Sequence, residues 1–354
     1  ELSSRGVTLR YPFLSDSFFQ ALARSGATGE DAGWLPRHVQ LDGGFLPLFE
    51  RRDSRGEYVF DYAWADAYER YGYRYYPKLV SAIPYTPVVG PRWRGDIDAG
   101  RMWRAVRERM AETGASGWHL LFPDRASRMA LAELPLVERQ ACHFRWFNHG
   151  YADFGDFLAR FQSRKRKNLR REREKVTAQE VQVERRLGST LSEAEWAHFY
   201  QCYASTYLKR GQWPYLTESF FTDLAASQGD QIMVALARHR DDTVAAALYL
   251  FDDQALYGRY WGCLREFDAL HFELCYYQGI EFAIEQGLTE FDPGVQGEHK
   301  LLRGFEPVIT YSLHWLAEPE FQRAVADFCA REARHVSGCR EEALTLLPFR
   351  SDLS

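Results

Sequence analysis

Three apolar segments follow one another in the second half of the chain, and the connections between them are too short for anything but tight turns. The segments are Ile232 to His239, Val244 to Phe251 and Ala255 to Cys263. The pairs Asp241-Asp242 and Asp252-Asp253 separate them. Runs of β-forming residues with connections of hairpin length predict three antiparallel strands in succession.

Helices and further strands surround this meander along the chain. Ser192 begins a long helix, because Glu195 follows three residues later and completes a capping box. Thr217 begins a second helix with an apolar face. The other elements expected here are strands at Val181 to Arg186, Leu288 to Asp292 and Val308 to Trp315, a helix at His271 to Glu285, and a closing helix around Asp327. This order of strands and helices predicts an α/β unit.

The first half also mixes short helices and strands. A helix is expected at Ser15 to Arg24, and Asp42-Gly43-Gly44 predicts a hairpin between 38–41 and 45–51. The other expected elements are strands at 79–83, 118–122 and 144–147 and a helix at 100–113. Between Gly56 and Pro91 the chain is rich in tyrosine, which is typical of a half-wet cavity and equally of an ordinary aromatic core.

The length of 354 residues predicts two domains, at roughly 150 residues each. We place them at 1–150 and 180–354, with a basic helical connector at 151–179. The longest apolar runs, such as Thr243 to Phe251, fall well short of the ~20 residues that a membrane-spanning helix needs. The first residue is Glu1 and not Met, so the sequence leaves open whether upstream residues were removed. The expected location is the cytoplasm, with peripheral attachment at the inner membrane face as an alternative.

The six cysteines are scattered without a CxxC pair, which argues against a zinc site and against a disulfide framework. We therefore expect no metal. They are expected to be small buried side chains.

A strongly basic stretch lies at residues 160–175, where nine basic residues stand against Glu172 and Glu174. The whole chain has a net charge of −5, so this is a basic patch on an acidic body. Such a patch indicates a local anionic partner, either tRNA or an anionic membrane surface, although a solvated helix is an equal alternative. The cations assigned to it are Arg164, Lys165, Arg166, Lys167, Arg170 and Arg171.

The segment FDPGVQGEHKLLRGFEP, residues 291–307, has the composition of a binding or catalytic site. It places an amide, an acid, an imidazole and two cations between glycines that permit tight bends and a close approach to a ligand. These polar residues are Gln296, Glu298, His299, Lys300 and Arg303. A solvated loop whose charges pair with one another is the alternative.

Several blocks together resemble the Fem-like family of N-acyltransferases, whose members are described as peptidoglycan biosynthesis or recognition proteins. The blocks, in the order the family has them, are YVFDYAWADAYERYGYRYYPKLVSAIPYTPVVGPR, GWHLLFP, SRKRKNLRRERE, YGRYWGC, HFELCYYQGIEFAIEQG and FDPGVQGEHKLLRGFEP. The resemblance covers nearly the whole chain. It implies an α/β fold of two tandem GNAT-like acyltransferase domains with mixed central sheets flanked by helices, of which the C-terminal one is expected to be catalytic.

The chain departs from GNAT domains that use acetyl-CoA at one place. Those domains carry an R/Q-x-x-G-x-G/A loop that holds the pyrophosphate, whereas the corresponding stretch here is GCLREFDALHFE. Either a longer-chain or non-CoA donor is held differently, or arginines such as Arg259 and Arg265 meet the phosphates. No permanently bound cofactor is expected, and acyl-CoA or aminoacyl-tRNA would be the co-substrate.

Amide formation requires a base and donors for the developing oxyanion, but no covalent nucleophile. Glu298 and His299 are the candidate bases, and Glu273 is a further acid or base for which a partner such as Arg259 is expected if it is buried. Lys300 and Arg303 are expected to face an anion. The remaining residues expected to bind the donor or the acceptor are Gln296, Tyr260, Trp261 and His271, with Tyr260 and Trp261 lining an acyl tunnel. Those expected to recognise the acceptor are Asp61, Trp64, Tyr76, Lys78 and Arg92.

Three functional hypotheses follow. The leading one is an N-acyltransferase that moves an acyl or aminoacyl group from a thioester, for example a long-chain acyl-CoA, or from an aminoacyl-tRNA to an amine such as a lipid amine. The second is a non-catalytic module that binds a cell-wall or lipid fragment, in which the 296–303 loop would point outward. The third, a nucleic-acid binder using the basic stretch, is weaker because that stretch lacks interleaved aromatic residues. The sequence does not identify the donor, the acceptor, the base or the oligomeric state.

Overall fold

The computed structural model describes residues 10–41, 43–295 and 297–350. The chain divides into two compact units, which are described separately. Unit 1 is formed by the described parts of 1–21, 144–308 and 342–354, and unit 2 by 22–143 and 309–341.

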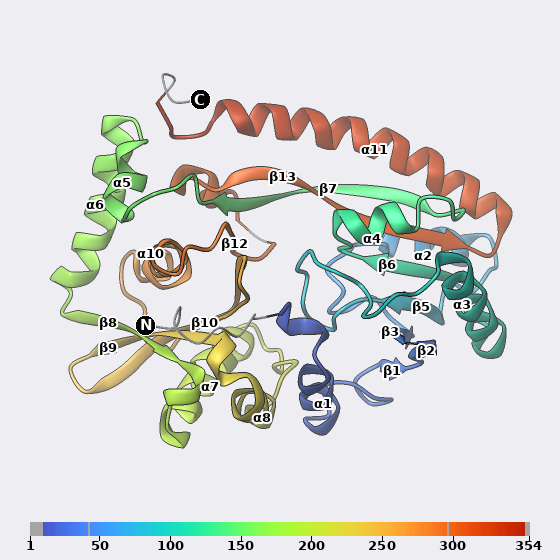
Figure 1. Ribbon diagram of the computed structural model, residues 1–354, viewed down its shortest axis with the longest axis horizontal. Helices are drawn as coiled ribbons and strands as arrows, with labels where there is room; N and C mark the ends of the chain where they lie inside the picture. Colours follow the sequence, from blue (N-terminus) through green and yellow to red (C-terminus); the bar gives the residue numbers. More distant parts are fainter. Residues whose placement is uncertain (1–9, 42, 296, 351–354) are drawn as a thin grey trace. The chain divides into compact units, whose positions relative to one another are not determined.

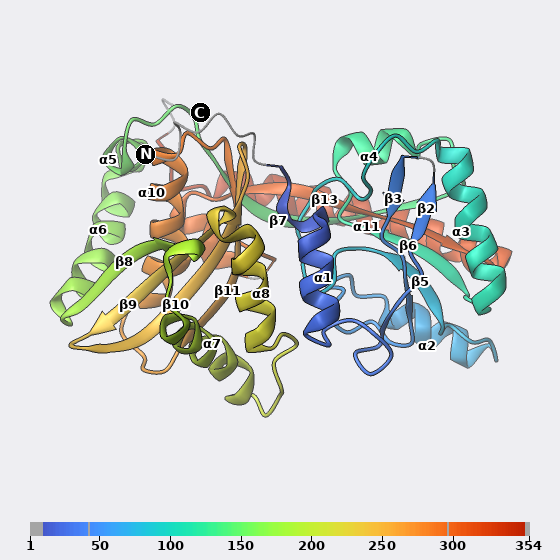
Figure 2. The same cartoon turned by 60° about the horizontal axis from the view of Figure 1, so that its bottom comes forward.

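Unit 1 is built on a mixed sheet in the strand order β7-β12-β11-β10-β9-β8. Neighbours from β8 to β11 are antiparallel, β12 lies parallel to β11, and β7 is antiparallel to β12. The strands are β8 (Val181–Leu187), β9 (Ile232–His239), β10 (Asp242–Phe251), β11 (Ala255–Cys263), β12 (Glu290–Asp292) and the end of β7 (Val137–Phe147). The meander predicted from the sequence is therefore confirmed as β9, β10 and β11 (Figure 2).

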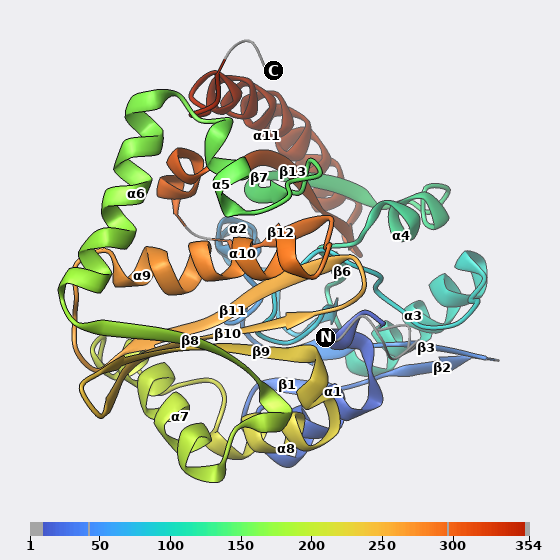
Figure 3. The same cartoon turned by 60° about the vertical axis from the view of Figure 1, so that its left-hand side comes forward.

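Helices cover both faces of this sheet, which explains why β9 and β10 are apolar almost throughout (Figure 3). On one face lie α7 (Glu193–Leu208) and α8 (Glu218–Gln228), and on the other lies α10 (Gln278–Glu285). The predicted capping box of α7 is confirmed, since Ser192 Oγ accepts the Glu195 amide and the Glu195 carboxylate accepts the Ser192 amide. The other elements of unit 1 are η2 (Pro12–Leu14), α5 (Phe154–Ala159), α6 (Ser163–Ala178), η3 (Gly188–Thr190), η4 (Gly229–Gln231), α9 (Leu270–Phe272), η5 (Glu273–Tyr277) and η6 (Glu298–Arg303).

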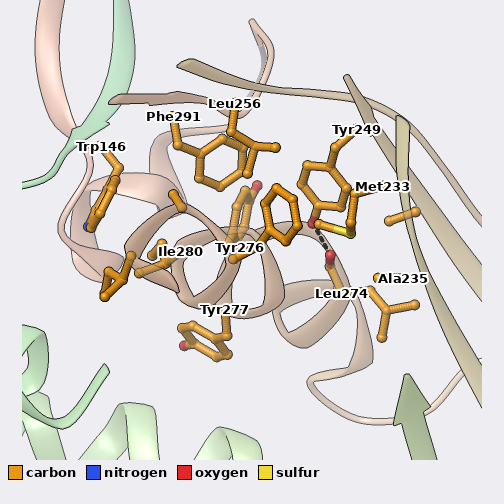
Figure 4. Packing of buried hydrophobic residues seen from close by; sticks show 14 of the residues in the cluster. Trp146, Met233, Ala235, Tyr249, Leu256, Leu274, Tyr276, Tyr277, Ile280 and Phe291 are labelled. Carbon is orange, nitrogen blue, oxygen red and sulfur yellow. Dashed lines mark hydrogen bonds between the residues drawn. The ribbon is translucent and has the colours of Figure 1, made fainter. Parts of the chain in front are cut away.

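The core of unit 1 lies between the sheet and the helix that follows β11 (Figure 4). Met233 and Tyr249 from the sheet pack beside Leu274 and Ile280 from the helix, and all four are buried. This packing fixes the helix to the sheet on the side that carries the polar 291–307 segment.

Unit 2 has its own mixed sheet, in the order β1-β4-β5-β6-β13, and a separate β2-β3 hairpin. Only β5 and β6 are parallel among these pairs. The elements are β1 (Trp34–Pro36), β2 (Val39–Leu41), β3 (Gly44–Leu46), β4 (Phe49–Arg51), α2 (Tyr62–Arg70), β5 (Lys78–Ser81), α3 (Ala99–Thr113), β6 (Gly117–Leu121) and α4 (Arg125–Ala130). Four further elements have residues in both units or close this one: α1 (Asp16–Arg24), β7, β13 (Glu306–Leu316) and α11 (Pro319–Thr345) (Figure 1).

The two faces of the unit 2 sheet differ in chemistry, because alternate residues of a strand point to opposite faces. On one face Leu79, Trp118, Leu120 and Leu313 join an apolar core together with α3. The other face carries buried polar and charged side chains, described below.

The predicted fold class is confirmed, since each unit has a mixed sheet flanked by helices. Three details differ from the sequence expectations. The helix expected at 271–285 contains the π-helical segment η5, the strand expected at 45–51 is divided into β3 and β4, and α2 lies within the tyrosine-rich stretch where no helix was expected. Residues 309–341 lie in the same compact unit as 22–143, so the units are not contiguous in sequence. Among the described residues, no helix combines the length and the apolar character needed to cross a bilayer.

Candidate active site

The loop after β12 folds inward. Lys300 is 1% exposed, and its Nζ donates a hydrogen bond to the Gly294 carbonyl at 2.5 Å. Gly297 has φ 110°, and a Cβ at this position would lie 2.4 Å from Cε1 of His299. Glycine therefore allows the imidazole of His299 to lie against the backbone of its own loop. An outward-pointing loop, which the binding-module hypothesis requires, is not what the structure shows.

Burial also makes Lys300 easier to deprotonate. Burial lowers the pKa of Lys300 to about 8, although the negative charge of Asp292 acts in the opposite direction. An ammonium group with this pKa is close to its neutral form under mildly basic conditions, which is unusual for lysine.

His299 lies in an aromatic cluster. Its Nε2 is 2.8 Å from the Tyr276 hydroxyl, and its ring centroid is 5.9 Å from that of His271 and 5.5 Å from that of Phe272. Trp261 contacts His271 edge to face at 5.2 Å. Imidazole, phenol and apolar rings thus form one half-buried wall.

Both imidazoles of this wall are held in the neutral form. Burial, followed by the positive charges of Arg303 and Lys300, lowers the pKa of His299 below its usual 6.5. Burial, His299 and the same cations lower the pKa of His271 to about 4. A neutral imidazole can accept a proton, so His299 is a competent base near neutral pH.

The π-helical segment η5 positions Tyr276 and Tyr277. The two side chains leave the helix in different directions, with Tyr276 toward Phe291 and the core and Tyr277 toward the opposite side (Figure 4). The Tyr249 hydroxyl of β10 donates to the Leu274 carbonyl inside this segment. Such wide turns are frequent at functional sites, because they redirect single side chains within a helix.

Charged pairs tie α6 to this site. Arg173 binds Glu273 at 2.8 and 3.0 Å and Glu281 at 2.5 Å. Glu172 accepts two hydrogen bonds from Arg303, at 2.7 and 3.2 Å, and a further one from Tyr277. Bidentate arginine–carboxylate pairs fix orientation as well as distance, so α6, the η5 helix and the η6 loop form one connected structure.

The strands beside the site diverge. β11 pairs with β12 only from Ala255 to Tyr257, although β11 continues to Cys263. In the pairing with β10, Tyr249 lies opposite Gly258 and Leu248 opposite Tyr260, so Arg259 is the extra residue of a β-bulge. The second half of β11 is thus separated from β12 and carries Trp261 toward the helix.

The structure corrects several sequence expectations about partners. Glu273 is buried and has partners, but these are Arg173 and Gln278 and not Arg259. Arg303 was expected to face an anion, and the anion that it meets is the Glu172 carboxylate of the chain itself; its guanidinium also lies over the Phe272 ring at 3.3 Å.

Tyr260 and Trp261 do not line one common wall. As neighbours in a strand they point to opposite faces, and Tyr260 packs against Tyr203 and Phe221 beneath α7 and α8. Only Trp261 lies with His271. Gln296 lies outside the described residues; Glu298 begins η6, and its side chain also falls outside the description.

The sequence analysis missed Tyr276, Phe272 and the inward-facing pair Glu172 and Arg173. A signal for the pair was present, because Leu169 and Val176 are the buried positions of α6 and the pair lies between them at helical spacing. The composition of the stretch concealed this spacing.

The outward-facing cations of α6, which form the basic patch, differ from the inward-facing pair in having no ionic partner within the part of the chain that the structure describes. None of its six cations forms an ion pair with the described residues, and Arg164, Lys167, Arg170 and Arg171 are exposed. The outer face of α6 therefore presents unneutralised positive charge.

In unit 2, part of the expected acceptor-side set meets in a buried ionic cluster. Lys78 is 0% exposed and donates to Glu57 at 2.7 Å, to Asp61 at 2.5 Å and to Ser54 at 2.8 Å. The carboxylates outweigh burial and raise the pKa of Lys78. Burial acts to raise the pKa of Asp61, but the charge and hydrogen bond of Lys78 outweigh it and hold this pKa far below its usual value. Tyr75 also donates to Asp61.

The other expected acceptor-side residues are distributed around this cluster. Tyr76 reaches it through Ser54 at 2.9 Å, and Trp64 packs edge to face on His314 at 4.9 Å. Arg92 is buried elsewhere, against the Gly90 and Val88 carbonyls. The role of these residues in acceptor binding stays a prediction.

Two buried histidines extend the cluster. His119 and His314 face each other across β6 and β13, with their Nδ1 atoms 2.7 Å apart. Burial, and then the Lys78 charge, lowers the pKa of His119 to about 3, and burial with His119 lowers that of His314 well below 6.5. Both are therefore neutral in the folded protein.

This neutrality predicts acid sensitivity of unit 2. Below pH 6.5 the unfolded chain binds protons on both imidazoles and the folded chain does not, so the free energy of unfolding decreases as the pH is lowered. The slope is about 1.4 kcal/mol per pH unit for each histidine. Urea unfolding at successive pH values measures it, and His314→Gln should reduce the slope. A flat profile from neutral pH to about 5 would contradict the burial of two neutral imidazoles.

Comparisons with known proteins identify the family and the fold. The FemAB-like family model, described as peptidoglycan biosynthesis/recognition, matches residues 4–351. No curated protein matches. Among solved structures, the C-terminal domain of a putative lysylphosphatidylglycerol synthetase from Agrobacterium fabrum has a TM-score of 0.55 at 12% identity, covering 88% of this chain and 91% of that one. FemX has a TM-score of 0.54 at 10% identity, covering 92% and 96%, and L-PGS from Bacillus licheniformis has 0.54 at 10%, covering 92% and 98%. At these identities the structural matches establish a shared fold.

Proposed function

The chain belongs to the FemAB-like family and has the fold of Fem/GNAT-like acyl or aminoacyl transferases, and from this we propose that it is an N-acyltransferase. It moves a long-chain acyl group from a thioester directly to an amine. The observation that carries the proposal is the neutral His299 imidazole, bonded to Tyr276 within a half-buried aromatic wall. Such a wall suits an apolar acyl chain, and the imidazole suits an amine that must lose a proton.

The transfer needs no covalent enzyme intermediate. The amine nitrogen attacks the thioester carbonyl carbon, the C–N bond forms, and the C–S bond breaks. His299 takes the proton that the nitrogen loses, and the departing thiolate takes up a proton to leave as a thiol. Lys300 supplies positive charge close to His299, which favours negative charge developing on the carbonyl oxygen, whereas the charge of Arg303 is paired with Glu172.

Two features favour a long-chain donor over acetyl-CoA. The glycine-rich pyrophosphate loop is absent from 264–269, where Arg265 instead lies over the Phe267 ring at 5.2 Å. The wall of Trp261, His271 and Phe272 offers apolar surface beyond what an acetyl group requires. A lipid amine, for instance a sphingoid-type base, is the proposed acceptor.

An aminoacyl-tRNA donor is the second candidate, and the unpaired cations of α6 favour it. This alternative makes a distinct prediction about salt. Binding through many phosphate contacts weakens steeply as salt rises, whereas an acyl chain held by apolar contacts does not.

Donor identity is testable with the purified protein. We expect mass spectrometry of co-purifying molecules to find a long-chain lipid, and an assay with long-chain acyl-CoA and a long-chain base to yield the amide. With substrates supplied without anionic vesicles, a variant with Arg164, Lys167 and Arg171 replaced by serine should keep this activity, because those side chains lie on the outer face of α6. Aminoacyl transfer from charged tRNA, lost in that variant and at high salt, would instead establish the second candidate.

A further inference from the structure

A loop of unit 1 exposes large apolar side chains to solvent. In the segment 208–215, which we name the aromatic loop, Trp213 is 85% exposed, Leu208 52% and Tyr215 37%. Tryptophan in particular is seldom left so open in a water-soluble surface, and clustered exposed apolar residues mark an interaction site.

The aromatic loop is held in this form. The Gly211 amide donates to the Leu208 carbonyl and the Gln212 amide to the Tyr207 carbonyl, both at about the length of ordinary hydrogen bonds. At the far end, the Leu216 amide donates to the Tyr203 hydroxyl at 3.3 Å. Because hydrogen bonds hold both ends of the loop, its conformation keeps Trp213 exposed.

The start of the aromatic loop contacts the main chain of β11, the strand that carries Trp261. Thr206, just before the loop, donates to the Trp261 carbonyl at 2.8 Å, and Lys209 donates to the Cys263 carbonyl at 3.0 Å. The next residue of that segment, Leu264, is itself 44% exposed. Exposed apolar side chains of the aromatic loop and of Leu264 therefore lie near the end of β11, which also carries Trp261.

Charged side chains of both signs flank these apolar side chains, since Glu266 is 86% exposed beside the cations. Arg210 is exposed and forms no ion pair with the described residues, while Lys209 lies 3.8 Å from Glu266. On the other side, Lys175 of α6 donates to the Asp268 carboxylate at 2.7 Å, and Gln179, just after the helix, donates to the Asp268 carbonyl at 3.0 Å. The C-terminal end of the basic helix is thus linked, through Asp268, to the segment that carries Leu264.

We propose that this surface, formed by the aromatic loop, the 264–268 segment and α6, docks on an anionic lipid bilayer. Tryptophan and leucine side chains partition into the boundary between headgroups and acyl chains, and basic side chains bind the anionic headgroups. The charge of α6 is complementary to such a membrane, and the docked face would hold the wall of Trp261 and His271 close to lipid substrates. The inference deepens the proposed function, yet it is measured without any acyl transfer.

Vesicle sedimentation tests the proposal directly. The full chain is expected to bind phosphatidylglycerol–phosphatidylcholine vesicles and to bind pure phosphatidylcholine vesicles far more weakly. The double variant Trp213→Ser, Leu264→Ser should bind the anionic vesicles at least about tenfold more weakly than the wild type. The matched control is Phe60→Ser, Met129→Ser in unit 2, whose side chains are each 66% exposed, and it should bind like the wild type.

A second readout avoids dependence on the folding of the variant. Brominated lipids should quench part of the wild-type tryptophan fluorescence, and Trp213→Phe should remove most of that quenching. The proposal would be overturned if the full chain did not bind anionic vesicles, or if the Trp213→Ser, Leu264→Ser variant bound them as well as the wild type. It would also be overturned if the quenching persisted in Trp213→Phe. A stable dimer that the double variant dissociates would overturn it as well, since the surface would then bind a second copy. If the protein bound membranes but formed no amide product, this inference would stand and the proposed acyltransferase activity would be refuted.

Discussion

Replacing His299 by alanine is expected to lower kcat/KM for amide formation by about 10²- to 10⁴-fold, the usual contribution of a positioned general base. The imidazole is held neutral by burial and by two neighbouring cations, and Tyr276 orients it at 2.8 Å. Alanine removes the proton acceptor but leaves the ion pairs of Glu172 and Arg173 in place. Steady-state rates with the acyl thioester and the amine measure the effect.

Two controls separate a catalytic from a structural role. His198→Ala, at an exposed histidine of α7, should leave the rate unchanged. Because His299 acts as a base only when unprotonated, the wild-type rate should fall with acid through its lowered pKa, with the midpoint below pH 6.5. That acid limb should disappear in His299→Ala. An acid limb identical in both proteins would assign the base to another group.

The second large effect concerns stability. Lys78→Met is expected to lower the free energy of unfolding by about 3–5 kcal/mol, because it leaves Glu57 and Asp61 buried without their counter-charge. Arg52→Met is the matched control, since Arg52 is 66% exposed and lies 3.6 Å from Glu50, and exposed pairs contribute about 0–1 kcal/mol. Urea unfolding of the three proteins gives the comparison. A loss below about 1 kcal/mol for Lys78→Met would mean that the cluster is hydrated in solution.

The parts of the fold that follow from local sequence were predictable. The β9–β11 meander and the Ser192 cap depend on residues within a few positions of each other, and both were predicted. The η5 segment was not, because a single i+5 turn has no compositional mark. The return of 309–341 to unit 2 depends on pairing between β6 and β13, which are distant in sequence.

The candidate site shows the same division. The 291–307 segment was recognised from its own residues, but the partner of His299 comes from η5 and the partners of Glu273 and Arg303 come from α6. Likewise Lys78 and Asp61 were selected from the tyrosine-rich block, whereas His119 and His314 lie 195 residues apart and meet only across the sheet. Residue type predicts candidates, and long-range packing decides which of them meet.

A single-turnover experiment tests the central claim most directly. The protein, in excess over a long-chain acyl-CoA, is mixed with a long-chain amine while the amide and the intact mass of the protein are followed together. Direct transfer predicts that amide appears as fast as the thioester disappears, that the protein gains no acyl mass, and that His299→Ala slows both by about 10²-fold or more. Accumulation of an acylated protein, or thioester consumption that yields no amide, would contradict the account.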